Sequence, residues 1–206
     1  MTQRLYIHPD NPQKRLIKQA CDVVLNGGII VYPTDSGYAF GCHIGDKKAM
    51  DKIRQWRQLS AEHNFTLVCR DLSDIALYAK MDNSVFRIIK AHTPGAYTFI
   101  LPATKEVPRR LQHAKRKTIG LRIPDNPVAL ALLTEMGEPI MSSTLIAPNE
   151  TSPMTDQDAI YDWLKKKVDL MIDTGYGDEQ PTTVIEFIDN HPQVVRQGLG
   201  DSQPFE

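Results

Sequence analysis

Short apolar segments alternate with amphipathic segments along this chain, and this alternation constrains the fold more than any other feature of the sequence. Segments with the apolar character and length of strands lie at 29–32, 65–69, 94–101, 118–124, 139–146, 168–173, 182–187 and 193–198. Between them, helical patterns lie at 12–26, 46–57, 72–80, 83–91, 127–136 and 156–166. Strands and helices mix without a strict β-α-β repeat, which favours a mixed sheet with helices against it.

The predicted fold is therefore α/β with a mixed α+β order: one domain with a twisted, open, mixed β-sheet flanked by helices. The chain has 206 residues and no linker-like stretch, so we expect a single domain over 1–206 with its core at about 12–200. Asn11 is predicted to cap the first helix, and Gly137 to end the helix that Pro127 opens.

Composition excludes several classes of protein. The formal net charge of -1 argues neither for nor against a nucleic-acid partner. The three cysteines form no CxxC pair, which indicates reduced thiols, and the six scattered histidines have no metal spacing and are interpreted as surface or loop residues. The spacing of these residues predicts no metal site. The first residues are polar and no apolar run has the length of a membrane span, so we expect a cytoplasmic protein with no membrane partner.

The stretch VYPTDSGYAFGC, residues 31–42, changes abruptly from a buried strand to polar side chains. Thr34, Asp35 and Ser36 follow the strand directly, and ligands of α/β sheets bind in crevices beyond strand ends. The alternative is a plain turn, in which Asp35 and Ser36 bond only to nearby backbone.

Hydroxyls and arginines occur at other predicted strand and helix ends too. Arg122 lies inside an apolar strand, where a charged side chain needs solvent, a partner or a ligand, although strand alternation can also point it outward. Arg57 and Arg54 end a helix, where they can equally complement its dipole. Because arginine binds carboxylate and phosphate with a planar fork, these residues together predict a pocket for an anionic small molecule. No standard catalytic motif is present, so no catalytic residue is assigned.

The segment 105–122 contains seven basic residues and a single acid, Glu106. Such a patch binds phosphate backbones with an affinity that depends on salt, and a solvated surface is the equally weighted alternative. The predicted RNA-binding residues are Lys105, Arg109, Arg110, Lys115, Arg116 and Lys117.

Taken together, the motifs of this chain resemble the YrdC/YciO family, with the closest likeness to its YciO branch. YPTDSGYAFG is similar to the family's first signature, TPGAYTFIL to its PGP-x-T-x-I-L element and TIGLRIPDNP to its V-G-x-R-x-P-x-H-P strand. PIMSSTLI stands where the family has a serine-x-asparagine strand, and PTTVIEF and VVRQG resemble its last two motifs. The motifs run in order over about residues 12–200.

The resemblance implies a large concave, positively charged cavity and binding of double-stranded RNA or tRNA. The best understood members are threonylcarbamoyl-AMP synthases, nucleotidyltransferases of the tRNA threonylcarbamoyladenosine modification. Their substrates are L-threonine, bicarbonate and ATP with Mg²⁺, and no cofactor is bound tightly. By position, the resemblance implies threonine binding by Thr34, Arg122 and Thr144, and nucleotide binding by Arg54, Arg57, Ser142, Ser143, Thr183 and Arg196.

The chain departs from the family pattern on the nucleotide side. The family's lysine-x-arginine pair reads Gln55-Trp56-Arg57, and the asparagine of the serine-x-asparagine motif is Ile146. Loss of a cation and of an amide each weakens binding by roughly 1–3 kcal/mol. Three hypotheses therefore stay open: an adenylylating enzyme, a non-catalytic RNA-binding protein, and a binder of a small anionic metabolite.

Overall fold

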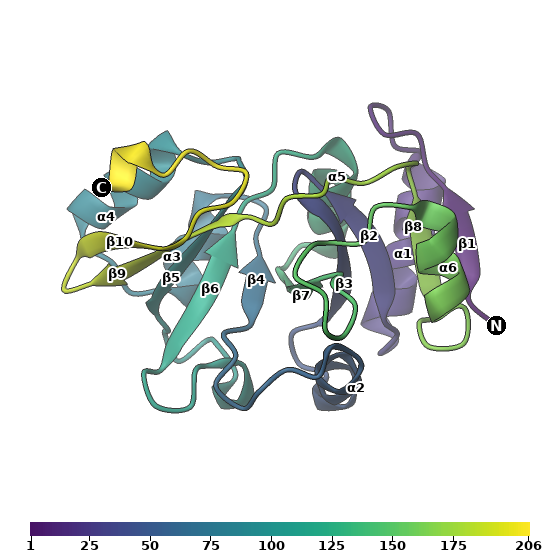
Figure 1. The fold of residues 1–206 in the computed structure, drawn as a ribbon, viewed down its shortest axis with the longest axis horizontal. Helices are drawn as coiled ribbons and strands as arrows, with labels where there is room; N and C mark the ends of the chain where they lie inside the picture. The colour runs from purple at the N-terminus through teal and green to yellow at the C-terminus, as the bar shows by residue number, and fades with distance from the viewer.

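A ten-stranded mixed sheet runs through the whole molecule, with the N-terminus at one end and the C-terminus near the other (Figure 1). The computed structural model describes residues 1–206. In sheet order the strands are β1 (Gln3–Tyr6), β8 (Leu170–Asp173), β2 (Ile30–Thr34), β3 (Gly37–His43), β7 (Ile140–Thr144), β4 (Thr66–Val68), β6 (Thr118–Arg122), β5 (Tyr97–Pro102), β9 (Thr183–Ile188) and β10 (His191–Arg196). The predicted single-domain, mixed α/β architecture with a twisted, open sheet is confirmed.

The sheet contains both parallel and antiparallel pairs. Strands β1, β8 and β2 are parallel, β2 and β3 form an antiparallel hairpin, and β7 pairs antiparallel with β3 and β4. Strand β6 is parallel to β4 and antiparallel to β5, β5 is parallel to β9, and β10 closes the sheet antiparallel to β9. The parallel pairs need crossover connections, which the helices supply.

The helices begin and end at residues suited to those positions. They are α1 (Lys14–Leu25), α2 (Lys47–Arg57), α3 (Leu72–Tyr78), α4 (Asn83–Ala91), α5 (Pro127–Met136) and α6 (Gln157–Leu164), with short 3₁₀ turns η1 (Arg109–Leu111) and η2 (Gln203–Phe205). Asp46 caps α2 by accepting the Ala49 N–H, and Asn126 caps α5 by accepting the Ala129 N–H. Gly137 ends α5 in the left-handed conformation, as predicted.

Two clusters of apolar side chains cover opposite faces of the sheet. Along β2, Val31 joins the larger cluster, to which α2, α3, α4 and α6 contribute, whereas Ile30 and Tyr32 join the smaller cluster under α1 and α5. Because neighbouring residues of a strand point to opposite faces, the two clusters lie on either side of the sheet. Helices α1 and α5 pack on each other and contact β2, so beyond β7 they leave that face uncovered.

Three local predictions were wrong. Helix α1 is capped at Gln13, not Asn11, because the His8 imidazole accepts the N–H groups of Asp10 and Asn11 and holds this segment in a turn. Strand β1 was missed because its four residues are mostly polar and lie at the sheet edge. Strand β3 was missed because glycine or alanine occupies every second position from Gly37 to Gly41 and gives a weak strand signal, although every residue from Gly37 to Cys42 is buried.

Two further features bear on expectations from composition. All three cysteines are buried and unpaired with one another, which agrees with reduced thiols. None of the helices combines the length and the apolar composition that a membrane crossing requires.

Candidate functional site

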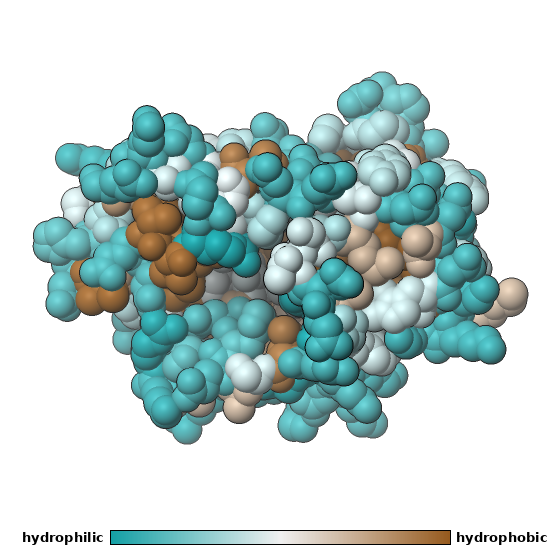
Figure 2. Space-filling model, in the orientation of Figure 1, coloured by the Kyte–Doolittle hydropathy of each residue, from teal (hydrophilic) through white to brown (hydrophobic).

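The floor of the main cavity is a row of residues that crosses four adjacent strands on the uncovered face. Thr66 of β4 is paired with Ser142 of β7 on one side and Gly120 of β6 on the other, and Gly120 is paired with Ile100 of β5. The cavity above them encloses about 430 Å³. Figure 2 shows a depression near the middle of this face, with mostly hydrophilic side chains around it.

Gly120 leaves its part of the cavity floor free of a side chain. A Cβ atom at this position would lie 2.9 Å from Thr66 Oγ1, 3.1 Å from the Phe65 carbonyl oxygen and 3.2 Å from Thr98 Cγ2. All three contacts are closer than ordinary van der Waals separation, so any larger residue crowds the space between the strands.

Two arginines give the main cavity its charge. Arg57, at the end of α2, donates from NH1 to Ser143 Oγ at 2.8 Å, and its buried Nε has no hydrogen-bond partner. Arg196 of β10 donates from NH2 to the Thr182 carbonyl at 2.8 Å. Burial lowers the pKa of both guanidiniums, and the charge of Arg196 adds to the effect on Arg57, whose pKa falls to about 10.

No free carboxylate balances these two charges. Among the residues that line the main cavity the only acid is Glu62, which is bound to Lys115 Nζ at 2.7 Å. An unpaired buried donor beside a second cation is a costly arrangement, and an anion entering the cavity relieves it. The electrostatics therefore suit a phosphate or carboxylate ligand.

His63 completes this wall of the cavity. Its pKa is lowered to about 4, first by burial and then by the charges of Arg57, Arg54 and Arg196. The ring is therefore neutral at physiological pH. His63 lies in the connecting segment between α2 and β4, in agreement with its interpretation as a surface or loop residue, and this segment lines the cavity.

A smaller recess of about 30 Å³ continues from the main cavity toward the end of β2. The two spaces share the residues Thr66, Thr98, Ser142, Thr144 and Thr182. The recess adds Thr34 of β2 and the guanidinium-bearing Arg122 of β6. Its volume is that of about one water molecule, so a larger ligand must extend into the main cavity or displace part of the wall.

Arg122 is held in the recess by an ion pair with Asp35, whose second oxygen accepts the Asp125 N–H at 2.9 Å. The buried Nε of Arg122 has no partner. Thr34 Oγ1 donates to the Gly37 carbonyl at 2.6 Å and accepts the Ser36 N–H at 3.1 Å. The turn therefore uses the proton of the Thr34 hydroxyl, while Arg122 keeps a free donor for an acceptor in the recess.

Two connecting segments cover the turn after β2 and the start of β3. The segment between β8 and β9 crosses the middle of the molecule (Figure 1), and its Gly175 carbonyl accepts a 2.6 Å bond from the Tyr38 hydroxyl. Gly177 N–H donates to the Thr155 carbonyl at 2.9 Å, which ties this segment to the one before α6. The Tyr38 hydroxyl therefore anchors this cover to β3.

Most of the residues assigned to a small-molecule site are brought together. Thr34, Arg122 and Thr144 meet in the recess, and the main cavity is lined by Arg57, Ser142, Ser143, Thr144 and Arg196.

Two assigned residues lie elsewhere. Arg54 donates to the Ser60 carbonyl at 3.1 Å and lies over the Phe65 ring, outside both spaces. Thr183 is fully buried, with its hydroxyl donated to the Gly200 carbonyl, and its neighbour Thr182 lines the cavity instead. A shift of one residue along a strand exchanges its two faces.

Thr66, Thr98, Tyr38 and Thr182 line the site but were not assigned from the sequence. A signal was present, because Thr66 and Thr98 are hydroxyl residues inside otherwise apolar strand segments. A polar residue in that position points to a polar space on one face of the sheet.

The basic segment does not form one patch. Arg110 donates to the Gly45 carbonyl at 2.6 Å, Arg116 is paired with Glu186 at 2.5 Å, and Lys115 is paired with Glu62. Lys105, Arg109 and Lys117 instead line a separate hollow of about 660 Å³ with Lys80, and no acid lines it. We call this space the basic hollow.

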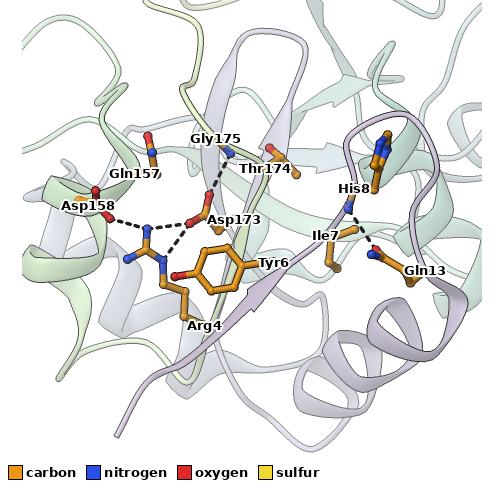
Figure 3. Close-up of a pocket in the computed structure, with 10 residues that line it drawn as sticks. All are labelled: Arg4, Tyr6, Ile7, His8, Gln13, Gln157, Asp158, Asp173, Thr174 and Gly175. Atoms are coloured by element: carbon orange, nitrogen blue, oxygen red, sulfur yellow. Dashed lines mark hydrogen bonds and ion pairs between the residues drawn. The ribbon is translucent and has the colours of Figure 1, made fainter.

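Another surface hollow, of about 590 Å³, lies between β1, the start of α6 and the end of β8 (Figure 3). Its one arginine, Arg4, is bonded to Asp173 at 2.7 Å and to Asp158 at 2.6 Å, so its charge is already neutralised. This hollow lacks the unbalanced positive charge of the main cavity. Nowhere do three or more His, Cys, Asp or Glu side chains come together as ligands for a metal ion.

Comparison with known proteins gives the chain its family. It is 57% identical over 205 residues to YciO of Escherichia coli (strain K12), covering all of both chains, and it matches the E. coli YciO crystal structure over its full length with a TM-score of 0.97. It is 27% identical over 186 residues, 88% of this chain and 53% of the other, to the threonylcarbamoyl-AMP synthase of Bacillus subtilis (strain 168).

The crystal structure of P. abyssi Sua5 complexed with L-threonine shares the fold, with a TM-score of 0.87 and 22% identity over 96% of this chain and 58% of that one. The family model Sua5/YciO/YrdC, described as "Telomere recombination", matches residues 22–198. The chain therefore belongs to the Sua5/YciO/YrdC family.

Proposed function

We propose that this protein is an adenylylating enzyme that joins ATP to a carbamate made from L-threonine and bicarbonate. The observation that carries the proposal is the unbalanced pair Arg57 and Arg196, directly continuous with a recess that presents the unpaired Nε of Arg122. Two separated anion-binding groups in one cavity suit a substrate pair of a nucleotide and an amino acid. The relatives support this choice, since one is named a threonylcarbamoyl-AMP synthase and another was solved with L-threonine.

The proposed reaction balances without an additional reagent. The ammonium group of threonine loses a proton, and the resulting amine combines with bicarbonate to give a carbamate and water. A carbamate oxygen then attacks the α-phosphorus of ATP, and the bond to the β-phosphate oxygen breaks to release pyrophosphate. Such an in-line displacement depends mainly on position and charge neutralisation. A site without a conspicuous general base is therefore adequate.

Each part of the cavity has a separate task in this reaction. Arg122 binds the carboxylate of threonine through its unpaired Nε, and Thr144 lies where the two spaces join, near the reacting groups. Arg57 and Arg196 bind the phosphates and neutralise the charge that develops on pyrophosphate. The one acid that lines the main cavity is paired with Lys115, so Mg²⁺ would enter as part of the ATP complex.

A reduced activity would originate in the proposed nucleotide-binding part of the main cavity. Ile146 lines the main cavity at the position where the family motif has an asparagine, and Arg54 turns away from it. Loss of one amide hydrogen bond to a phosphate corresponds to roughly 1–3 kcal/mol. We therefore expect this protein to bind ATP more weakly than synthases that keep the motif, while its binding of L-threonine is affected less.

The test is release of pyrophosphate from ATP that depends on both L-threonine and bicarbonate. Arg57→Ala and Arg122→Ala should each abolish it, while Arg54→Ala, which removes an arginine of the same helix outside the cavity, should leave it nearly intact. Calorimetry separates the two subsites, because Arg122→Ala should lose L-threonine binding and keep ATP binding. Release that is absent in the unmodified protein, or equal in all four proteins, contradicts the proposal.

A second candidate function is RNA binding, with double-stranded RNA or tRNA as the partner. It is favoured by the basic hollow, where Lys80, Lys105, Arg109 and Lys117 converge from separate segments without an acid. Cations held in this way replace counterions of a phosphate backbone, so affinity falls steeply with salt.

The RNA hypothesis is tested by changing these four residues together to glutamine. Binding to tRNA should weaken at least tenfold and its salt dependence should become shallower. Changing Lys165, Lys166 and Lys167 to glutamine is the control for a general loss of charge, since these residues lie beside α6 and do not line the hollow. Equal losses in both variants contradict a specific role for the basic hollow.

A further inference from the structure

We propose that His63 couples anion binding in the main cavity to proton uptake: it is neutral in the free site and becomes a third cation when a phosphate-type anion binds at Arg57 and Arg196. This inference rests on the anion-binding part of the proposed function and not on formation of an adenylate. It names a ligand-responsive group that the proposed reaction scheme does not use.

The position of His63 is the first basis for the proposal. The residue lies in the segment that joins α2 to β4 and lines the same cavity as Arg57 and Arg196. Its ring meets the Phe65 ring edge-on, with centroids 5.5 Å apart and planes at 83°. Neither ring nitrogen is used in a hydrogen bond within the protein, so both remain for a ligand.

The surrounding charges are the second basis. Arg57 and Arg54 face the imidazole from α2, and Arg196 faces it from β10. The neighbouring carboxylate, Glu62, turns to Lys115 of the segment before β6, and both of these side chains are largely exposed. Burial is the largest effect that opposes protonation of the ring, and three cations with no free acid oppose it further.

A bound anion reverses the electrostatic part of this balance. A divalent phosphate or sulfate placed between Arg57 and Arg196 cancels their repulsion and presents acceptors to the imidazole N–H groups. The pKa of His63 should then return from about 4 toward its ordinary value of 6.5. With the bound value near 6.5, about 0.7 proton is taken up per anion at pH 6, and affinity rises roughly tenfold between pH 7.5 and pH 5.5.

Sulfate is the appropriate probe, because its charge is constant from pH 5 to pH 8 whereas the phosphates of ATP titrate in that range. The His63 ring protons, assigned by their loss in His63→Gln, report its titration by NMR in the free protein and at saturating sulfate. Sulfate affinity is measured at pH 5.5 and 7.5 by calorimetry in buffers of different ionisation enthalpy, which gives the number of protons exchanged.

We expect the His63 titration to move up by at least one pH unit on sulfate binding, with net proton uptake that His63→Gln removes. His191→Gln is the matched control, because this exposed histidine at the start of β10 does not line the cavity. Arg57→Gln should raise the titration midpoint of His63 in the free protein, since it removes a nearby cation.

The outcomes separate this inference from the proposed function. Sulfate binding with an unchanged His63 titration, or with equal proton uptake in the His63→Gln variant, overturns the inference and leaves the anion site standing. Absence of sulfate binding at both pH values overturns the inference and the anion site together. Proton-linked sulfate binding without release of pyrophosphate from ATP supports the inference and contradicts the adenylylation reaction alone.

Discussion

Asp35 and Arg122 form an ion pair that joins the turn after β2 to β6, across three intervening strands of the sheet. Both side chains are nearly inaccessible, with 14% and 6% of their surface exposed. A backbone N–H, that of Asp125, binds the second oxygen of Asp35, so the carboxylate also fixes the segment that leads into α5. The pair thereby sets the end wall of the recess and the orientation of Arg122.

Replacement of Asp35 by asparagine should lower the free energy of unfolding by about 3 kcal/mol, because it leaves the buried Arg122 charge without its partner. Urea denaturation of the purified variant measures this change. The double variant Asp35→Asn, Arg122→Met removes the stranded charge and should recover at least half of the loss. A single variant as stable as the unmodified protein would show that the pair does not hold the recess.

The cover of the turn after β2 can be tested at Gly37, where φ is +103° and a Cβ atom would lie 2.9 Å from the Asp178 carbonyl oxygen and 3.3 Å from Pro153 Cβ. Gly37→Ala should cost about 2–3 kcal/mol, combining backbone strain with displacement of both covering segments. Gly137→Ala has a positive φ of +72° and open space around the Cβ position, so it isolates the strain at about 1 kcal/mol.

The measurement for Gly37→Ala is thermal unfolding together with limited proteolysis of residues 174–181. Faster cleavage of this segment in Gly37→Ala than in Gly137→Ala is the expected result. Equal cleavage and equal stability in the two variants would contradict a packed cover over the turn after β2.

The sequence predicts the parts of this fold in which local pattern and tertiary context agree. The apolar strands and the caps at Asp46 and Gly137 are of this kind, since each depends on a few neighbouring residues. Strand β3 is not, because its partners β2 and β7 define it, and the glycine or alanine at every second position carries little strand signal. The ion pair Asp35–Arg122 joins residues 87 positions apart and has no local signature.

The candidate site shows the same division. Family motifs place Arg57, Arg122 and Arg196 correctly in the cavity walls, because each motif includes the strand or helix end that positions its arginine. They do not decide which of two adjacent threonines, 182 or 183, faces the cavity, since this depends on the pleat of one strand. The neutral state of His63 is likewise set by burial and by the charges of three arginines, which only the folded chain brings about.

The low floor of the main cavity predicts a specific sensitivity at Gly120. The added methyl group of Gly120→Ala would contact Thr66 Oγ1 and the Phe65 carbonyl, and the latter belongs to backbone that cannot move away easily. We expect a loss of about 1–3 kcal/mol in stability and roughly tenfold weaker ATP binding, because the methyl group occupies the cavity floor.

Calorimetry with ATP and urea denaturation give both values for Gly120→Ala. Thr66→Ser provides the complementary control, since it trims the facing side chain and keeps its hydroxyl. The double variant Gly120→Ala, Thr66→Ser should regain part of the lost stability. Unchanged ATP affinity in Gly120→Ala would indicate that the nucleotide does not reach the floor formed by β4 and β6.

Acid should destabilise this protein through His63, and the sign follows from the direction of its pKa shift. The folded protein binds the His63 proton only near pH 4, whereas the unfolded chain binds it near pH 6.5. The unfolded state therefore holds more protons between these values, and stability falls as pH decreases through this window. The loss begins below pH 6.5 and is complete below pH 4, with a size of about 2 kcal/mol after allowance for the partial exposure of the ring.

Urea denaturation at pH 7 and pH 4 should show His63→Gln losing about 2 kcal/mol less than the unmodified protein, because all other titrating groups are common to both. Parallel losses in the two proteins would mean that burial and the three arginines do not oppose protonation of His63 in the folded state.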